Sequence, residues 1–225
     1  MKFTFISRNG DILPLAQKVE SEGNQVTFYV VGDEELLNDK RIIDDGPDVV
    51  IIDSPGFGRL SSKLNKLGFP VSGGSLFSDT ITSDIKYHNT FLKACGMYTN
   101  GMGRIPNSIG IDIEGWFTGK DFAAVIYTLN SVSFPGFKQD KLYKECLEPI
   151  IKALKKSGHI GPVSIKSFIN SDSIQFETVK THFSTATLLS LMEGIKSNLS
   201  NILVGMASGA NRWIMFKPGY FIGIQ

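Results

Sequence analysis

The sequence has little of the features that reveal a function directly. It contains two cysteines, Cys95 and Cys146, which lie far apart and have no neighbouring histidine. We therefore predict free thiols in a reducing cytoplasm rather than a disulfide, a zinc site or a thiol nucleophile. No apolar run comes near the roughly 18 residues of a membrane span, and no secretory leader pattern is recognisable.

An excess of charge of one sign is lacking as well. The 23 Lys and Arg residues nearly balance the 22 Asp and Glu residues, which leaves a net charge of +1. Such a chain carries no strong field that would attract nucleic acid or an anionic membrane. The composition, 42% hydrophobic and 20% charged, is typical of globular proteins. We therefore expect a small-molecule partner, and neither nucleic acid nor a membrane.

Short apolar runs alternate with helical patterns in the first part of the chain, residues 1–97. The run Asp48–Ile52 is nearly continuous, as in a strand buried on both faces of a parallel sheet. The alternation predicts right-handed βαβ units and a Rossmann-like parallel sheet. The predicted strands are Lys2–Ser7, Gln25–Val31, Asp48–Ile52 and Pro70–Ser72, and the predicted helices are Ile12–Ser21, Asp33–Leu37, Leu60–Gly68 and Asp84–Cys95.

Residues 98–108 combine glycine, proline, threonine and asparagine with little periodicity, which predicts a linker. The remaining residues, 109–225, predict an α+β domain of antiparallel strands covered by two long helices. The predicted hairpins join Ile109–Trp116 to Phe122–Leu129, Val163–Ile169 to Ser173–Val179, and Trp213–Phe216 to Tyr220–Ile224, and the predicted helices are Lys138–Ser157 and Ser184–Leu199.

Three glycine-containing loops follow predicted parallel strands: Ser7–Pro14, Ser54–Gly58 and Ser72–Ser75. The carboxyl ends of neighbouring parallel strands meet at one sheet edge, where open α/β sheets bind small anionic molecules. Glycine lets the backbone approach a ligand closely, and the start of a helix offers N–H groups to a phosphate. The alternative is that these segments only reverse the chain. The first loop has a single glycine, so it lacks the dinucleotide fingerprint.

A second motif, Ile111–Phe122, places Glu114 before a predicted turn and Asp121 after it. Two carboxylates so arranged can accept hydrogen bonds from ribose hydroxyls or an exocyclic amine. The alternative is a solvated hairpin with ordinary surface charges. The three histidines, interpreted as turn or helix-end residues, are His88, His159 and His182.

Six segments of the chain carry a resemblance to a known family. They are SRNGDILPLAQKVESEG, PDVVIIDSPGFGRLSSKLNKLGFPVSGGS, SDIKYHNTFLKACGM, IEGWFTGKDF, LEPIIKALKKSGHIGPVSI and IQFETVKTHFS. In this order they resemble the ATP-grasp superfamily, and within it the divergent phage-type relatives of glycinamide ribonucleotide synthetase (phosphoribosylamine–glycine ligase). The resemblance implies a pre-ATP-grasp α/β domain followed by a partial ATP-grasp domain.

It also implies a carboxylate–amine ligase of purine biosynthesis. In the family, ATP with Mg²⁺ or Mn²⁺ activates a carboxylate as an acyl phosphate, which a phosphorylated amine attacks. No catalytic residue is assigned. The implied binding residues are Glu114, Asp121 and Lys86 for the nucleotide, Gly10, Pro55, Gly73, Gly74 and Ser75 for the phosphorylated substrate, and Glu177 and Gln175 for the metal.

The chain also departs from the family pattern. Tyr98–Ile109 is too short for the small subdomain that supplies the lysines for the ATP phosphates, and His182 falls near the position of a family arginine. Gln175 is neutral where Mg²⁺ prefers charged oxygen ligands. Phosphoryl transfer depends on such positioning and charge, so the sequence predicts a degenerate ligase. The alternatives are an inactive ATP-grasp-like binding or structural protein and, with less support, a generic Rossmann-like nucleotide binder.

Overall fold

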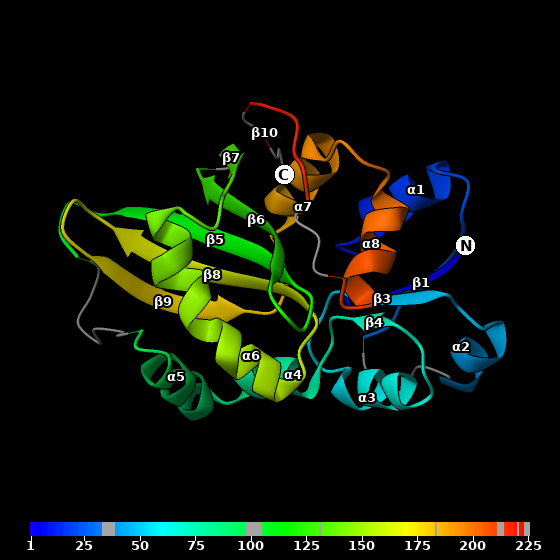
Figure 1. Cartoon of the computed structure of the whole chain (residues 1–225). Coiled ribbons are helices and arrows are strands. Elements are labelled where there is room, and N and C mark those ends of the chain that lie inside the picture. The colour runs from blue at the N-terminus through cyan, green and yellow to red at the C-terminus, as the bar shows by residue number, and fades with distance from the viewer. Residues whose placement is uncertain are drawn as a thin grey trace.

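The structure is a computed structural model that describes residues 1–32, 39–97, 105–130, 132–182, 184–210, 214–219 and 221–222. In this part of the chain, two sheets of unlike construction lie next to each other, with helices packed on both (Figure 1). No helix of the described residues is long and apolar enough to cross a membrane.

The first sheet is parallel throughout, in the order β2-β1-β3-β4. This confirms the parallel sheet expected for the first part of the chain. Its side chains alternate between two cores: Phe3 and Phe5 face one, and Ile6 faces the other. The strands are β1 (Lys2–Ser7), β2 (Gln25–Val30), β3 (Val49–Ile52) and β4 (Val71–Ser72), and the helices on this sheet are α1 (Leu13–Ser21), α2 (Asp39–Asp45) and α3 (Gly58–Lys66). The helix predicted at Asp33–Leu37 lies outside the described residues.

The second sheet is antiparallel, in the order β10-β7-β6-β5-β8-β9. The β5–β6 and β8–β9 hairpins are confirmed. A hairpin between Trp213–Phe216 and Tyr220–Ile224 is wrong for the described residues, because Phe216 bridges Ile195 and β10 pairs with β7. The strands are β5 (Ile109–Phe117), β6 (Phe122–Leu129), β7 (Val132–Pro135), β8 (Gly161–Ile169), β9 (Ile174–Lys180) and β10 (Phe221–Ile222).

The two long helices predicted in the second part of the chain are interrupted. The first passes through a π-helical turn and a 3₁₀ turn before α6 (Ile151–Ser157), and Pro149 explains the irregularity because it has no N–H for a helical hydrogen bond. The second, predicted over Ser184–Leu199, is interrupted after α7 (Thr185–Gly194), and the next helix, α8 (Leu199–Ala207), begins only where the predicted range ends. The Asn198 side chain accepts a hydrogen bond from Asn201 N and so begins α8 as a new helix.

Helices cross between the two sheets, which joins the halves of the chain into one packed body. The helices α4 (Leu76–Ser83) and α5 (Ile85–Ala94) precede the second sheet in sequence, yet Phe77 and Phe91 lie in its core. Conversely, Leu199 and Leu203 of α8 pack with α1 on the first sheet (Figure 1). The division into residues 1–97, a linker 98–108 and residues 109–225 stays a prediction, and only 105–108 of that linker lies within the described residues.

Candidate functional site

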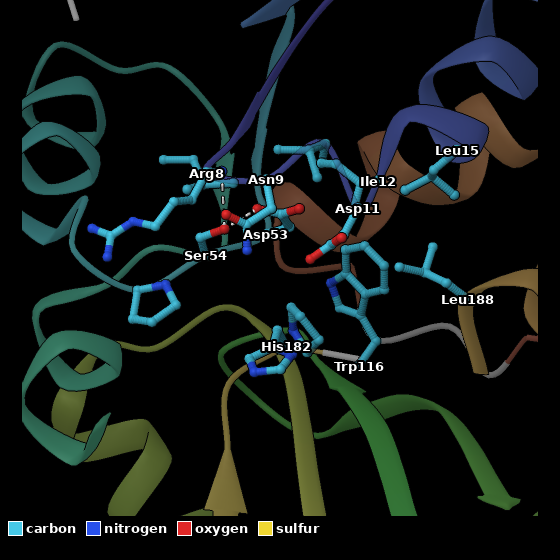
Figure 2. Close-up of a pocket in the computed structure, with 14 residues that line it drawn as sticks. Arg8, Asn9, Asp11, Ile12, Leu15, Asp53, Ser54, Trp116, His182 and Leu188 are labelled. Carbon is cyan, nitrogen blue, oxygen red and sulfur yellow. Dashed lines mark hydrogen bonds between the residues drawn. The ribbon is translucent and has the colours of Figure 1, made fainter. Parts of the chain in front are cut away.

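A hollow of about 240 Å³ lies between the two sheets, at the carboxyl ends of β1 and β3 (Figure 2). The loops that follow these two strands form one wall. The second sheet and α7 contribute the opposite wall. The residues that line this hollow, called the cleft below, are Arg8, Asn9, Asp11, Ile12, Leu15, Ile51, Ile52, Asp53, Ser54, Pro55, Trp116, Pro162, His182 and Leu188.

The loop after β1 is shaped by hydrogen bonds of its own residues. Gly10 has a φ of +86°, a value that glycine adopts without strain, and its N–H donates to Ser7 Oγ over 2.8 Å. The helix α1 begins three residues later, with Pro14 in its first turn and no side chain capping its N-terminus. The turn at Gly10 therefore carries Asn9 and Asp11 to the edge of the cleft.

Asp53 follows β3 directly and is the most buried carboxylate of the cleft, at 9% exposure. Ser7 Oγ donates to Asp53 Oδ2 over 2.7 Å, and the Ser54 hydroxyl donates to Oδ1. Burial raises the pKa of Asp53 above its ordinary value, although the two hydroxyl donors act in the opposite direction. A carboxylate is thus held in a fixed orientation at the polar end of the cleft.

The side chain of Arg8 is directed away from Asp53 (Figure 2). Its guanidinium carbon lies 5.9 Å from the centre of the Phe57 ring, a cation–π distance. Gly56 has a φ of +95°, and a β-carbon there would collide with the Arg8 guanidinium. The Arg8 guanidinium can occupy this position over the Phe57 ring because Gly56 has no side chain.

The apolar wall of the cleft is built around Trp116 of β5. Its indole Nε1 donates to Ser72 Oγ over 3.0 Å, which fixes the ring against the end of the first sheet. Ile12 and Leu15 from the α1 region and Leu188 from α7 complete this wall (Figure 2). The cleft therefore combines a polar end with a rigid aromatic and aliphatic side, the usual construction of a small-molecule site.

The loop Ser72–Ser75 lines a second hollow, of about 330 Å³, between α3 and the start of α4. Gly73 has a φ of +88° and lies directly against the carbonyl oxygen of Ile52. Among the expected substrate residues, Pro55 lines the cleft and Gly10 turns the loop beside it, whereas Gly73 and Ser75 line the second hollow and Gly74 is packed on Ile52. The structure therefore does not bring these residues together in one hollow.

His159 connects the two halves of the chain from a fully buried position. It follows the end of α6, as expected of a turn residue, but its Nδ1 lies 2.8 Å from Ser75 Oγ and its Nε2 3.3 Å from Pro162 O. Burial lowers its pKa to about 4, so the ring is neutral at pH 7. A neutral imidazole with both nitrogens in hydrogen bonds is a structural link.

The residues expected to hold the nucleotide have separate partners. Glu114 is fully buried and accepts hydrogen bonds from Ser184 N, over 3.0 Å, and from the Thr187 hydroxyl. Burial raises its pKa to about 8. The alternative interpretation of Glu114 as a solvated hairpin charge is therefore wrong.

The other two expected nucleotide residues do not line the cleft either: Asp121 is half-buried and Lys86 is exposed. Asp121 pairs with Lys138 and accepts a hydrogen bond from the Tyr143 hydroxyl over 2.9 Å. Burial alone would raise the pKa of Asp121, but the hydrogen bonds and the lysine charge lower it overall. Lys86 is exposed in the first turn of α5, where its backbone N–H donates to Asp84.

The expected metal ligands are also engaged elsewhere. Glu177 Oε2 lies 2.9 Å from Lys166 Nζ, and Gln175 Oε1 accepts a hydrogen bond from Ile105 N over 2.9 Å. The described residues contain no group of three or more His, Cys, Asp or Glu side chains that could hold a metal ion. Since Mg²⁺ and Mn²⁺ require several oxygen ligands, the residues in this part of the chain do not fit the expected ATP–metal site.

The sequence interpretation missed three lining residues that define the character of the cleft: Asp11, Asp53 and Trp116. The sequence did contain a signal for Asp53, which is a charged residue directly after the apolar run Val49–Ile52. Such a change from apolar to charged residues marks the carboxyl end of a buried strand, where ligands of open α/β sheets bind. Trp116 gave no such signal. Its place in the cleft depends on how the second sheet packs against the first.

No protein-family model matches the sequence, and no curated protein matches it. Solved structures do match. N5-carboxyaminoimidazole ribonucleotide synthetase from Thermus thermophilus has a TM-score of 0.68 at 10% identity, over 97% of this chain and 81% of that chain. D-alanine–D-alanine ligase from Bacillus anthracis, solved with ATP, has a TM-score of 0.60 at 9% identity, over 92% and 96%.

Larger proteins contain the same arrangement as a part. The chain spans 23% of the urea carboxylase from Kluyveromyces lactis, with a TM-score of 0.61 at 10% identity over 97% of this chain. The matched structures are ATP-grasp proteins, and at these identities the likeness shows the fold alone. The protein is thus an α/β protein with an ATP-grasp fold, as the sequence analysis expected. The narrower resemblance to glycinamide ribonucleotide synthetase and its phage-type relatives stays a prediction.

Proposed function

We propose that this chain is a small-molecule-binding protein built on the ATP-grasp fold, with its ligand in the cleft between the two sheets. One observation carries the proposal: a hollow of about 240 Å³ has polar groups on the loops of the first sheet and an apolar wall around Trp116 of the second. Ligands of open α/β sheets bind at this end of the strands. By contrast, the acids expected to hold ATP and metal pair with other side chains of the protein.

A plugged variant tests whether the cleft is the binding site. Asn9 is exposed at its rim, so Asn9→Trp fills the opening without disturbing the core. Asn201→Trp, exposed on α8, is the matched control. A library of small polar fragments is screened by ligand-observed NMR against the three proteins. We expect fragments that bind the wild type and Asn201→Trp to lose binding to Asn9→Trp. Equal binding by all three proteins places the ligand elsewhere and refutes the proposal.

The second candidate is an ATP-dependent carboxylate–amine ligase of the phosphoribosylamine–glycine ligase type, acting in cytoplasmic purine biosynthesis. The likeness to solved synthetases and ligases, one of them with ATP, favours it. In this role the cleft would hold the phosphorylated amine, and Glu114, Asp121 and Lys86 would have to rearrange around the nucleotide.

Melting temperature measured against Mg-ATP concentration tests the ligase. A bound nucleotide stabilises the fold by RT ln(1 + [L]/Kd), about 2.7 kcal/mol at a hundredfold excess over Kd. A ligase shows this stabilisation with Mg-ATP and less with Mg²⁺ alone. Gln175→Glu, which restores a carboxylate, should then strengthen the metal dependence. An unchanged melting temperature at millimolar Mg-ATP contradicts the ligase and leaves the cleft proposal intact.

A further inference from the structure

Among the residues that the structure describes, the buried carboxylate of Asp53 has no positively charged partner. At 9% exposure, its hydrogen bonds come from two neutral hydroxyls, those of Ser7 and Ser54. Within the described residues it makes no ion pair. A buried charge is costly unless a countercharge compensates it, and the raised pKa of Asp53 is the expected consequence.

The other charged groups of the cleft do not provide that countercharge at close range. Asp11 adds a second negative charge, and its effect on Asp53 is repulsive. Arg8 directs its guanidinium over the Phe57 ring and away from Asp53 (Figure 2). His182 lies across the cleft and acts to lower the pKa of Asp53, but burial outweighs it and the pKa stays raised. The polar end of the cleft is therefore suited to a cation, and it is ill suited to an anion.

The opposite wall fits the remainder of such a ligand. Trp116 is 4% exposed and is fixed by its hydrogen bond to Ser72. The face of an indole attracts a cation within about 6 Å and also packs well on flat apolar groups. Ile12 and Leu188 extend this apolar surface.

We propose that the cleft binds a small primary amine, whose ammonium group is held by Asp53 and Asp11 and whose apolar body lies against Trp116 and Leu188. The inference rests on the proposed function of the cleft and specifies the chemical class of its ligand. It differs from the anionic, phosphorylated ligand implied by the sequence resemblance, because here the carboxylates, and not the loop N–H groups, select the ligand.

Three probes of the same shape and different charge test the class: benzylamine, benzyl alcohol and benzoate. The chain has two tryptophans, so Trp213→Phe leaves Trp116 as the only one and makes its fluorescence a report on the cleft. Calorimetry on the unmodified protein provides a second measurement. We expect benzylamine to bind about tenfold more tightly than benzyl alcohol, because a hydrogen bond between charged groups is stronger than one from a neutral hydroxyl. We expect benzoate not to bind.

Two variants assign the preference to its residues. Asp53→Asn should remove most of the difference in affinity between benzylamine and benzyl alcohol. Asp11→Asn should reduce this difference, and because Asp11 is exposed, its substitution should not disturb folding. The exposed Asp172→Asn in the β8–β9 turn is the control and should leave it unchanged.

Three results overturn the amine in distinguishable ways. Benzoate or inorganic phosphate binding more tightly than benzylamine keeps the cleft as a site and refutes the amine class. If no probe binds and the fragments in the Asn9→Trp experiment bind elsewhere, the cleft itself fails. A preference for benzylamine that survives both Asp53→Asn and Asp11→Asn also refutes the assignment.

Discussion

Replacing Glu114 by glutamine should make the stability of the protein less dependent on pH. Glu114 lies on β5 beneath the start of α7, where Ser184 N and the Thr187 hydroxyl donate to its carboxyl oxygens. The Thr187 hydroxyl also lies 3.0 Å from that of Thr128. The carboxyl is thus the centre of a buried polar network that attaches α7 to the second sheet, and glutamine retains its shape without its titration.

The magnitude follows from the pKa of this carboxyl. Burial raises the pKa of Glu114 from an ordinary 4.5 to about 8 in the folded protein. Between these values the folded state retains a proton that the unfolded state has released, so the free energy of unfolding falls as pH rises. Each unit of difference corresponds to about 1.4 kcal/mol, so the whole interval amounts to a loss on the order of 4 kcal/mol by pH 8.

Urea unfolding at pH values from 5 to 9 measures this loss, because the midpoint and slope give the free energy at each pH. The wild type should lose stability across this range, and Glu114→Gln should lose markedly less. Glu20→Gln, at an exposed position on α1, is the control and should follow the wild type. If Glu114→Gln also runs parallel to the wild type at every pH, the carboxyl is not held protonated and the reasoning is refuted.

Two further perturbations address the link between the halves and the loop Ser72–Ser75. Because burial lowers the pKa of His159 to about 4, the unfolded state gains a proton first as pH falls below 6.5, and the free energy of unfolding should fall between pH 6.5 and 4. A His159→Gln variant should lack this acid dependence when the urea titration is extended down to pH 4. Gly73→Ala should lower the free energy of unfolding by more than the roughly 1 kcal/mol expected for Gly68→Ala. Both glycines have φ near +90°, but only at Gly73 does the carbonyl oxygen of Ile52 occupy the place of the new methyl group. Equal melting temperatures for the two variants contradict this prediction.

Local patterns were sufficient to predict the parallel sheet and two hairpins of the antiparallel sheet. The continuous apolar run of β3 indicates a strand buried on both faces, and the Gly119 turn between β5 and β6 indicates a hairpin. The interruptions of the long helices were not predicted. At α6 the pattern of apolar residues continues through Pro149, so periodicity alone does not reveal the π-helical turn. At Asn198 the cap competes with continuation of α7, and local propensity does not decide between them.

The polar and apolar residues of the cleft could not be predicted from the sequence, for a different reason. Glu114 and Asp53 both follow or interrupt apolar runs, and nothing in their neighbours indicates which of them will be covered by another helix. The position of α7 over β5 decides the question, since it supplies Ser184 and Thr187 to Glu114. Asp53 remains at the carboxyl end of its strand, with a hollow in front of it.

The pairing of the acidic residues also indicates that the ligand site lies at Asp53. Each acid that the family resemblance assigns to nucleotide or metal has a partner within the chain: hydroxyl and N–H donors for Glu114, Lys138 for Asp121 and Lys166 for Glu177. Rearranging Glu114 around a triphosphate is costly because its buried hydrogen bonds must be broken first, whereas the solvent-accessible lysine pairs of Asp121 and Glu177 contribute little. Asp53 is buried, makes no ion pair with any residue that the structure describes, and lies beside open space. A ligand that supplies positive charge there gains an interaction without having to displace one.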